Sequence, residues 1–341
     1  MVGRRNGIFA AVVLSITLAS LPQVANGVLL SAADGSKNTQ APPDDPGWAN
    51  VGIRGSFHSI VYLGNRWVLG ANHPGFGPVS FENVVFEPIP GSKVRITDPD
   101  DGTNADLQMF RLFEDPGLPS LEIVSATPSI DSELVLIGHG RNRGAATSWM
   151  GIDGWLWGSG HSMRWGTNLV TTTGLEVLDT RAFRLDFDAA GPAASSDEAQ
   201  SVTGDSGGGA FQKPAGQWQL AGILFASSGF VDQPAETSLY GNVAFAADLF
   251  RYRDQIVSTA SQPSCSDGLD DDDDGFVDWP ADPDCRGPLD PSEAAVPLPA
   301  LVGPAALALS GLLALSGLLA LSGLLALGGF AASKRRPSSA R

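Results

Sequence analysis

The sequence predicts an all-β domain between residues 47 and 262. Short runs rich in Val, Ile, Leu and Phe recur there between Gly and Pro residues, a pattern typical of a β-sandwich or barrel. The chain of 341 residues contains 41 Gly and 24 Pro, which is above average usage and favours many turns. Apolar residues make up 43% of the chain, which is enough to form a core and argues against wholesale disorder.

Eight apolar runs are expected to form strands, and one segment is expected to form a helix. Each run is short and dominated by Val, Ile, Leu and Phe, and helical periodicity is convincing only at the end of the domain. The expected strands are Ser59–Leu63, Arg66–Leu69, Val84–Phe86, Lys93–Ile96, Leu107–Leu112, Leu134–Ile137, Gln219–Phe225 and Asn242–Phe245, and the expected helix is Ala247–Ser258.

The charge balance argues against one class of partner. Asp and Glu total 37 and Lys and Arg total 21, so the formal net charge is −16. A nucleic-acid-binding protein needs a basic surface over the phosphates, and no Lys/Arg-rich stripe lies inside the chain. We therefore expect no nucleic-acid partner.

Residues 1–27 have the pattern of a secretory signal peptide. Two arginines precede the apolar run Ile8–Leu21, and Ala25 and Gly27 are small residues at the positions that signal peptidase reads. An uncleaved membrane anchor is the alternative, although the run is short for a bilayer span of about 20 residues. We expect export to an oxidising compartment, with residues 28–46 as the N-terminal segment of the exported chain.

Residues 295–341 have the pattern of a membrane-spanning segment with a basic tip. No charged residue lies between Glu293 and Lys334, and the unit Ala-Leu-Ser-Gly-Leu-Leu occurs three times in this interval. Pro304–Ala332 is long enough to cross a bilayer as a helix. The basic residues after it place the tip on the cytoplasmic side.

The start of this segment, Val296-Pro-Leu-Pro-Ala300, resembles the VPLPA/PEP-CTERM class of bacterial C-terminal sorting signals when read with the apolar stretch and basic tip. The resemblance implies a bacterial protein that is secreted or displayed on the cell surface. It also implies a membrane anchor at the C-terminus, before or instead of processing by a membrane sorting enzyme. A plain tail anchor is the alternative.

An acidic segment, residues 263–294, contains the only two cysteines of the chain. Nine aspartates lie between Cys265 and Cys285. We expect a disulfide between these cysteines, because an exported chain offers them no other partner. Closing a loop of this size contributes about 3 kcal/mol to stability.

The spacing of the aspartates in this segment predicts a calcium site. A hard cation with oxygen ligands would relieve the repulsion among the carboxylates. Three aspartates alternate before Gly275, as in the first half of a calcium-binding loop, and a fourth falls at the ninth position. The twelfth position is Ala281 where an EF-hand has Glu, so Asp282 and Asp284 would have to substitute. A solvated acidic linker is the alternative. The predicted ligands are Asp270, Asp272, Asp274 and Asp278.

The glycine-rich segment Thr203–Gly209 has the composition of a nucleophile loop. Its sequence, Thr-Gly-Asp-Ser-Gly-Gly-Gly, presents Ser206 between residues that permit a tight backbone. The N–H groups of Gly204 and Ser206 can point at one spot and so stabilise the oxyanion of an acyl-transfer intermediate. Ser206 alone is a weak nucleophile, so the chain should also contain a histidine base and an acid that orients it.

Three motifs, in order along the chain, resemble those of trypsin-like serine peptidases. Trp67-Val-Leu-Gly-Ala-Asn-His73 is similar to the family's histidine motif, and Asn104–Leu112 to the segment that carries its aspartate. Gly204-Asp-Ser-Gly-Gly208 is similar to the nucleophile motif. Further segments that resemble the family are Leu134–Gly140, Trp218–Phe225 and Arg251–Ile256, so that the likeness covers about 200 residues.

The resemblance implies two perpendicular six-stranded β-barrels, with a boundary near residues 125–131 and a short C-terminal helix. His73 would be the base, Asp106 the orienting acid and Ser206 the nucleophile, and the N–H groups of Gly204 and Ser206 would form the oxyanion hole. The implied function is a serine endopeptidase that hydrolyses protein or peptide substrates without a cofactor for catalysis. The alternative is a catalytically inactive, protease-like surface binding or adhesion module with a calcium-binding loop.

Several positions depart from the family's pattern. Gly70 replaces the usual Thr of the histidine motif, and Pro74 replaces the Cys that follows it. Gln200 stands six residues before the nucleophile, where trypsin has Asp, so cleavage after Lys or Arg is not implied. Phe225-Ala-Ser227 replaces the common Ser-Trp-Gly. The expected pocket residues are Gln200, Phe225 and Ser227.

Asp205 raises the question of activation. In the family, the Asp before the nucleophile pairs with a newly cut N-terminal amine. Signal-peptide cleavage after Gly27 would leave Val28 as the N-terminus. We expect Val28 to pair with Asp205. The alternative is that residues 28–46 form a disordered leader, as their Pro, Asp and Gly content favours.

Overall fold

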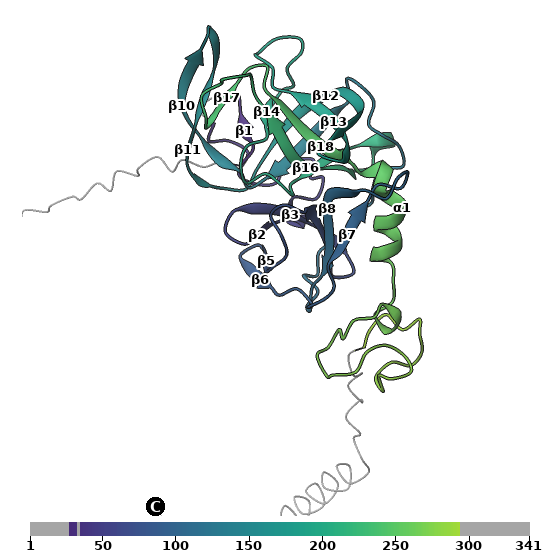
Figure 1. Cartoon of the computed structure of the whole chain (residues 1–341). Coiled ribbons are helices and arrows are strands. Elements are labelled where there is room, and N and C mark those ends of the chain that lie inside the picture. The colour runs from purple at the N-terminus through teal and green to yellow at the C-terminus, as the bar shows by residue number, and fades with distance from the viewer. Residues whose placement is uncertain (1–26, 33–34, 294–341) are drawn as a thin grey trace, which may run out of the picture. The chain divides into compact units, whose positions relative to one another are not determined.

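The computed structural model describes residues 27–32 and 35–293 (Figure 1). The described residues belong to one compact unit, which ends at Glu293. The predicted signal peptide up to residue 26 and the predicted sorting segment lie outside the described residues. Among the described residues, no helix is both long enough and apolar enough to cross a membrane.

The first half of the described chain forms one antiparallel sheet of seven strands, in the order β6-β5-β2-β3-β4-β8-β7 (Figure 1). All five apolar runs predicted as strands in this half are strands, with ends shifted by a few residues. The strands are β2 (Val51–Arg54), β3 (His58–Gly64), β4 (Trp67–Ala71), β5 (Val79–Phe81), β6 (Val84–Phe86), β7 (Val94–Thr97) and β8 (Asn104–Arg111).

This sheet corrects the expectation of a six-stranded first barrel. It has seven strands, and no continuous ladder closes it. The residues after β6 meet the end of β8 at an isolated bridge between Pro88 and Leu112, and the N–H of Ile89 donates to the carbonyl oxygen of Arg111 at 2.9 Å. Pro88 and Pro90 have no N–H to donate, so this stretch cannot extend a ladder.

The second half forms a closed six-stranded barrel, in the order β12-β13-β18-β16-β15-β9. The expectation of a six-stranded barrel is therefore confirmed for this half. Its ladders are antiparallel throughout, and the apolar run predicted at 134–137 is the buried centre of β9. The strands are β9 (Glu133–Gly138), β12 (Arg164–Val177), β13 (Thr180–Asp186), β15 (Gly209–Gln212), β16 (Gln219–Ser228) and β18 (Val243–Asp248).

Smaller elements complete the fold. A three-stranded sheet pairs β10 (Arg141–Trp149), β11 (Ile152–His161) and β17 (Thr237–Leu239), and β1 (Leu29–Leu30) pairs with β14 (Ala199–Gln200). The predicted C-terminal helix is confirmed as α1 (Leu249–Ala260). It starts two residues later than expected, because Asp248 caps it by accepting the N–H of Phe250. Short 3-10 turns lie at Trp48–Asn50, Pro214–Gly216 and Ser264–Ser266.

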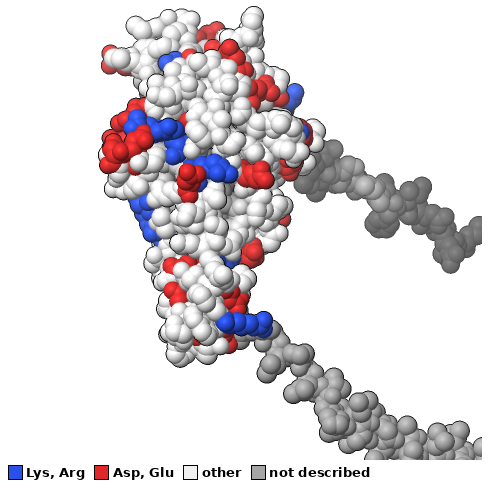
Figure 2. Space-filling model, turned by 90° about the vertical axis from the view of Figure 1, so that its right-hand side faces the viewer, with Lys and Arg blue, Asp and Glu red and all other residues white. Residues whose placement is uncertain are grey.

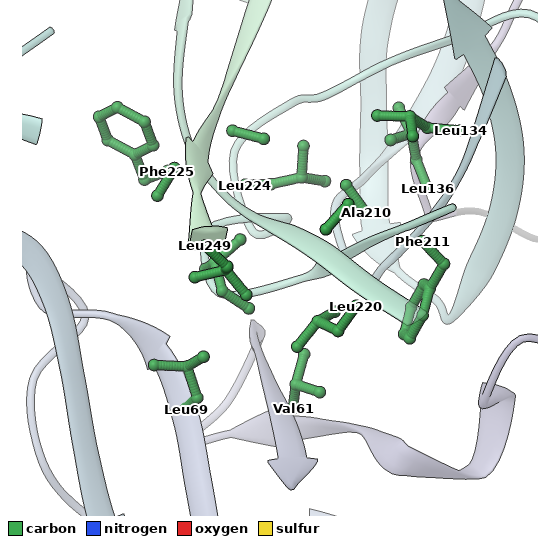
Figure 3. Close-up of a cluster of buried hydrophobic side chains, with 14 of the residues drawn as sticks. Val61, Leu69, Leu134, Leu136, Ala210, Phe211, Leu220, Leu224, Phe225 and Leu249 are labelled. Carbon is green, nitrogen blue, oxygen red and sulfur yellow. The ribbon is translucent and has the colours of Figure 1, made fainter. Parts of the chain in front are cut away.

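One apolar core connects the sheet to the barrel. Val61 of β3 and Leu69 of β4 extend toward Leu220 of β16 and Leu249 of α1 (Figure 3), and all four side chains are fully buried. Burying a side chain of this size contributes about 1.5–3 kcal/mol. The shared core therefore fixes β3 and β4 against the barrel, and the candidate site lies where they meet.

The acidic segment follows α1 and carries the expected disulfide. Cys265 and Cys285 are bonded, and both are buried. The contacts of this segment place it in the same compact unit as the sheet and the barrel. Figure 2 shows one face of the described residues. Its Lys and Arg side chains lie beside Asp and Glu side chains and form no continuous basic surface there.

Candidate active site

The candidate active site is built around His73 and Asp106. Nδ1 of His73 lies 2.6 Å from Oδ2 of Asp106. The other carboxylate oxygen, Oδ1, accepts the backbone N–H groups of Asn72 at 3.0 Å and of His73 at 2.9 Å. Because a carboxylate only accepts hydrogen bonds, Nδ1 carries the ring proton and Nε2 is left as an acceptor. The His73 side chain is 45% exposed, so a substrate can reach the ring.

Strand pairing brings these two residues together although they are 33 positions apart. In the ladder between β4 and β8, Ala71 is opposite Leu107, and Asp106 precedes Leu107 while His73 follows two residues after Ala71. The backbone N–H of Asp106 donates to Oγ1 of Thr180 at 2.8 Å, and Thr180 is fully buried. The sequence carried no signal for Thr180, because its strand was not predicted.

Ser206 lies in the turn between β14 and β15, packed against the sheet. Its carbonyl oxygen accepts the N–H of Ser59 at 3.1 Å. Gly207 has φ +94°, and a Cβ there would lie 2.0 Å from the carbonyl oxygen of Ser59 and 3.6 Å from the nitrogen of Ala71. Only glycine permits this approach. The turn therefore contacts the end of β4, two residues before His73.

The departure at Gly70 has a steric explanation. A Cβ at this position would lie 2.6 Å from Cδ1 of Ile60 and 3.7 Å from Cα of Gly207. The first distance is shorter than side-chain carbons tolerate without rearrangement. Glycine at position 70 thus lets Ile60 and the Ser206 turn pack directly on β4.

Two backbone N–H groups at the turn have no hydrogen-bond partner in the part of the chain that the structure describes. The N–H groups of Gly204 and Ser206 make no hydrogen bond to any other described residue. Gly204 has φ +105°, and its carbonyl oxygen accepts the hydroxyl of Ser59 at 3.1 Å. The same hydroxyl oxygen accepts the N–H of His139 at 2.8 Å. Ser59 therefore fixes the turn that presents the two N–H groups. No sequence signal identified it.

The other three histidines of the chain also lie around this site. The ring centroids of His58 and His73 are 6.3 Å apart, and those of His139 and His161 are 5.8 Å apart. Burial, and secondarily the charges of Arg54 and His73, lowers the pKa of His58 to about 4. Burial also lowers the pKa of His139. Both rings are therefore neutral at neutral pH.

Asp205 is buried, and it directly precedes Ser206 in the chain. Its Oδ1 accepts the N–H of Gly140 at 2.7 Å, and its Oδ2 accepts the N–H of Val202 at 2.8 Å. A Cβ at Gly138 or Gly140 would lie within 2.5 Å of the carboxylate, so these two glycines form its cradle. Burial raises the pKa of Asp205 to about 7 in spite of these bonds.

The first described residues belong to the fold and approach this region. Val28 is fully buried, and Leu29 is opposite Gln200 in the ladder between β1 and β14. Extending the antiparallel register by one residue places Val28 opposite Ser201. Residues 28–30 are therefore packed and paired within the fold, which a disordered leader would not be.

A cavity of about 250 Å³ contains two of the three predicted pocket residues. Gln200 and Ser227 line it, whereas Phe225 is buried in the main core. Gln200 donates through Nε2 to the carbonyl oxygen of Val243 at 3.1 Å, and its buried Oε1 has no partner among the described residues. Glu236, 60% exposed and paired with Arg141, is the charged residue of this lining.

Comparisons with known proteins found a match only among solved structures. No protein-family model matches the chain, and no curated protein matches its sequence. Among solved structures, the chain is similar to neuropsin, a serine protease expressed in the limbic system of mouse brain. The two share 16% sequence identity with a TM-score of 0.44, over 65% of this chain and 98% of the neuropsin chain. The function is therefore judged on the contacts described above.

Proposed function

We propose that the protein is a trypsin-like serine endopeptidase that hydrolyses peptide bonds in protein or peptide substrates. The observation that carries the proposal is the 2.6 Å contact between Nδ1 of His73 and Oδ2 of Asp106. This contact selects the tautomer whose Nε2 can accept a proton. The turn that carries Ser206 packs on the strand that leads to His73, as a nucleophile beside its base requires.

In the proposed mechanism, the hydroxyl of Ser206 attacks the substrate carbonyl while Nε2 of His73 accepts its proton. Asp106 holds the ring and stabilises the imidazolium that forms. The unpartnered N–H groups of Gly204 and Ser206 donate to the oxyanion of the tetrahedral intermediate. His73 then protonates the leaving amine, and water releases the acyl-enzyme by the same steps. These steps use no cofactor.

The lining of the 250 Å³ cavity favours an uncharged side chain before the scissile bond, because Glu236, the charged residue of that lining, is already paired with Arg141. Gln200 and Ser227 offer neutral polar groups, and the free Oε1 of Gln200 can accept a hydrogen bond from a substrate. The buried carboxylate of Glu198 is engaged elsewhere, because it accepts the N–H groups of Asp188 and Ser195. We therefore propose substrates with neutral polar side chains at this position, not Lys or Arg.

Activation would follow from removal of the leader. Ser201, which lies opposite Val28, directly precedes Val202, and the N–H of Val202 donates to the carboxylate of Asp205. A free ammonium at Val28 would supply a second cation, besides Arg164, to a buried carboxylate that accepts two N–H groups from the described residues. We propose that cleavage after Gly27 creates this pair. An active enzyme whose N-terminus lies well beyond Val28, as read by mass spectrometry, would contradict the pairing.

The terminal segments support a proposal for localisation. Residues 1–27 would be removed by signal peptidase, and residues 295–341 would hold the protein at the membrane until a membrane sorting enzyme acts on them. The peptidase would then be secreted, or displayed on the cell surface of a bacterium. Its excess of acidic residues makes a nucleic-acid partner unfavourable.

Covalent labelling with a fluorophosphonate tests the enzyme proposal. A fluorophosphonate reacts only with a serine that a neighbouring base activates, so the wild-type protein should be labelled and Ser206→Ala should not. Ser125→Ala is the matched control, because Ser125 is exposed and outside the site. It should be labelled like the wild type. A folded wild-type protein that stays unlabelled, after its N-terminus has been shown to be Val28, would overturn the proposal and favour an inactive binding module.

A further inference from the structure

Two overlapping groups of carboxylates lie in the acidic segment. Oxygens of Asp270, Asp272 and Asp274 lie within 4.8 Å of one another, and so do oxygens of Asp274, Asp282 and Asp284. Asp274 belongs to both groups, so the five side chains form one continuous cluster. Carboxylates at this spacing repel one another unless a cation lies among them.

Asp282 is the member of this cluster that indicates a ligand. It is 1% exposed, the most buried of the five. Its Oδ1 accepts the N–H of Asp284 at 2.7 Å, whereas its buried Oδ2 has no hydrogen-bond partner among the described residues. Oδ1 of Asp270 is likewise buried without a partner. A buried carboxylate oxygen without a donor is costly, and a bound cation would supply the missing interaction.

Two other aspartates of the segment are held by arginines of the sheet. Asp267 and Asp271 both contact the guanidinium of Arg111, which is fully buried in β8. Asp271 also pairs with Arg66 at 2.8 Å, and both arginines donate to the hydroxyl of Ser264 at 2.8 Å. These contacts anchor the segment to the β4–β8 side of the sheet. Because Asp267 and Asp271 are already paired with arginines, neither needs a bound cation to balance its charge.

Asp278, the fourth ligand predicted from the spacing, has a different role. Its carboxylate accepts the N–H groups of Asp267 at 2.9 Å and of Gly268 at 2.8 Å. Glu293 acts in a similar way, accepting the N–H groups of Asp271 and Asp278. Both carboxylates therefore hold the backbone of the segment and stand outside the cluster.

We propose that the cluster of Asp270, Asp272, Asp274, Asp282 and Asp284 binds calcium, with Asp274 shared between its two groups of oxygens. The donors are all carboxylate oxygens, which a hard cation prefers. Calcium takes about 6–8 oxygens in flexible geometry, whereas magnesium demands near-octahedral geometry and keeps its waters. The disulfide and the Arg111 contacts hold the segment in place, so little order has to be gained on binding.

Isothermal titration calorimetry of the full-length protein, stripped with EDTA, tests this site directly. Calcium chloride should bind with a Kd no weaker than about 10⁻³ M, and magnesium chloride should bind more weakly. Asp282→Asn removes the buried ligand with almost no change in shape and should weaken calcium binding about tenfold or more. Asp272→Asn, at a less buried position, should do the same.

Asp273→Asn is the matched control. Asp273 lies in the same run of aspartates but outside both groups, is exposed, and has φ +61°, where Asn is well tolerated. It removes the same charge and should leave calcium affinity unchanged. Circular dichroism establishes that each protein is folded. Absence of calcium binding by the folded wild type would overturn the proposal. Equal weakening by Asp273→Asn and Asp282→Asn would also overturn it, because binding would then reflect diffuse charge.

Discussion

Asp106 in the candidate active site and Asp282 in the acidic segment illustrate two ways of placing a carboxylate. The two oxygens of Asp106 receive three hydrogen bonds, from the backbone of Asn72 and from the backbone and ring of His73. Asp282 is far more buried, yet the described residues give it a single N–H donor and leave Oδ2 with none. The fold satisfies the first carboxylate completely and the second only in part.

The difference in hydrogen bonding separates carboxylates that hold other protein groups in place from carboxylates that still have an oxygen free to bind a ligand. A fully bonded carboxylate such as Asp106 can only orient what it touches, which suits a residue that positions a base. Asp267 and Asp271 are an intermediate case, since a buried arginine of β8 balances their charge. Each kind of aspartate should therefore respond to mutation in its own way.

The largest expected effect is on catalysis. Asp106→Asn should lower kcat/KM by about 10⁴-fold, because the amide no longer holds the His73 ring in the tautomer that accepts a proton. Hydrolysis of a peptide substrate measures this, with the stability of the variant checked by denaturation. Asp131→Asn is the control, since Asp131 is exposed at φ +66° and far from the dyad in sequence. A similar loss in both variants would show that Asp106 acts through general charge, not orientation.

A smaller effect is expected where the acidic segment meets the sheet. Arg111→Met should lower the free energy of unfolding by about 3–5 kcal/mol, because Asp267 and Asp271 would lose their buried counter-charge. Urea denaturation measures the change. The control is Arg251→Met, which removes an exposed pair with Asp100 and should cost less than about 1 kcal/mol. Equal changes in the two variants would mean that the segment does not depend on this anchor.

The apolar runs of the sequence predicted β3 and β9 but carried no signal for the hairpin of β10 and β11. In β3 and β9 nearly every residue is buried, so an apolar run marks each strand. In β10 and β11 buried and exposed residues mix irregularly, and register shifts interrupt their ladder. Such a hairpin is stabilised by its partner strands, and a partner far along the chain leaves no local pattern.

The sequence motifs singled out the residues of the candidate site but not the residues that hold them in place. The motifs identified His73, Asp106 and Ser206 because their chemistry restricts the residue types around them. Thr180 and Ser59 are ordinary polar residues in the sequence, and their roles arise only when distant strands meet. The calcium prediction was limited in the same way, since spacing alone cannot show that Asp278 binds backbone N–H groups while Asp282 is left without a partner.

The smallest expected effect is on the pH dependence of the free energy of unfolding, to which the candidate active site and the acidic segment contribute with opposite signs. The pKa of His58 falls from 6.5 to about 4 on folding, chiefly through burial. Between these values the unfolded chain binds a proton that the folded protein does not, so stability should fall as pH drops from 6.5 to about 4.

In the acidic segment the pH dependence of stability has the opposite sign. Burial and Asp271 raise the pKa of Asp267 from 3.8 to about 7, so its contribution is present at low pH and lost as pH rises toward 7.

The variant His58→Gln isolates the first of these contributions. His58 is only half buried, so solvent screening reduces its effect to about 1 kcal/mol across the window. Urea denaturation of wild type and variant, at pH 6.5 and at about pH 4, should show that the difference in their unfolding free energies shifts by this amount in favour of the variant at the lower pH. The Asp267 contribution is common to both proteins and cancels in the comparison. A difference that does not change with pH would place the proton uptake elsewhere, and would remove His58 from the groups that make the candidate active site sensitive to acid.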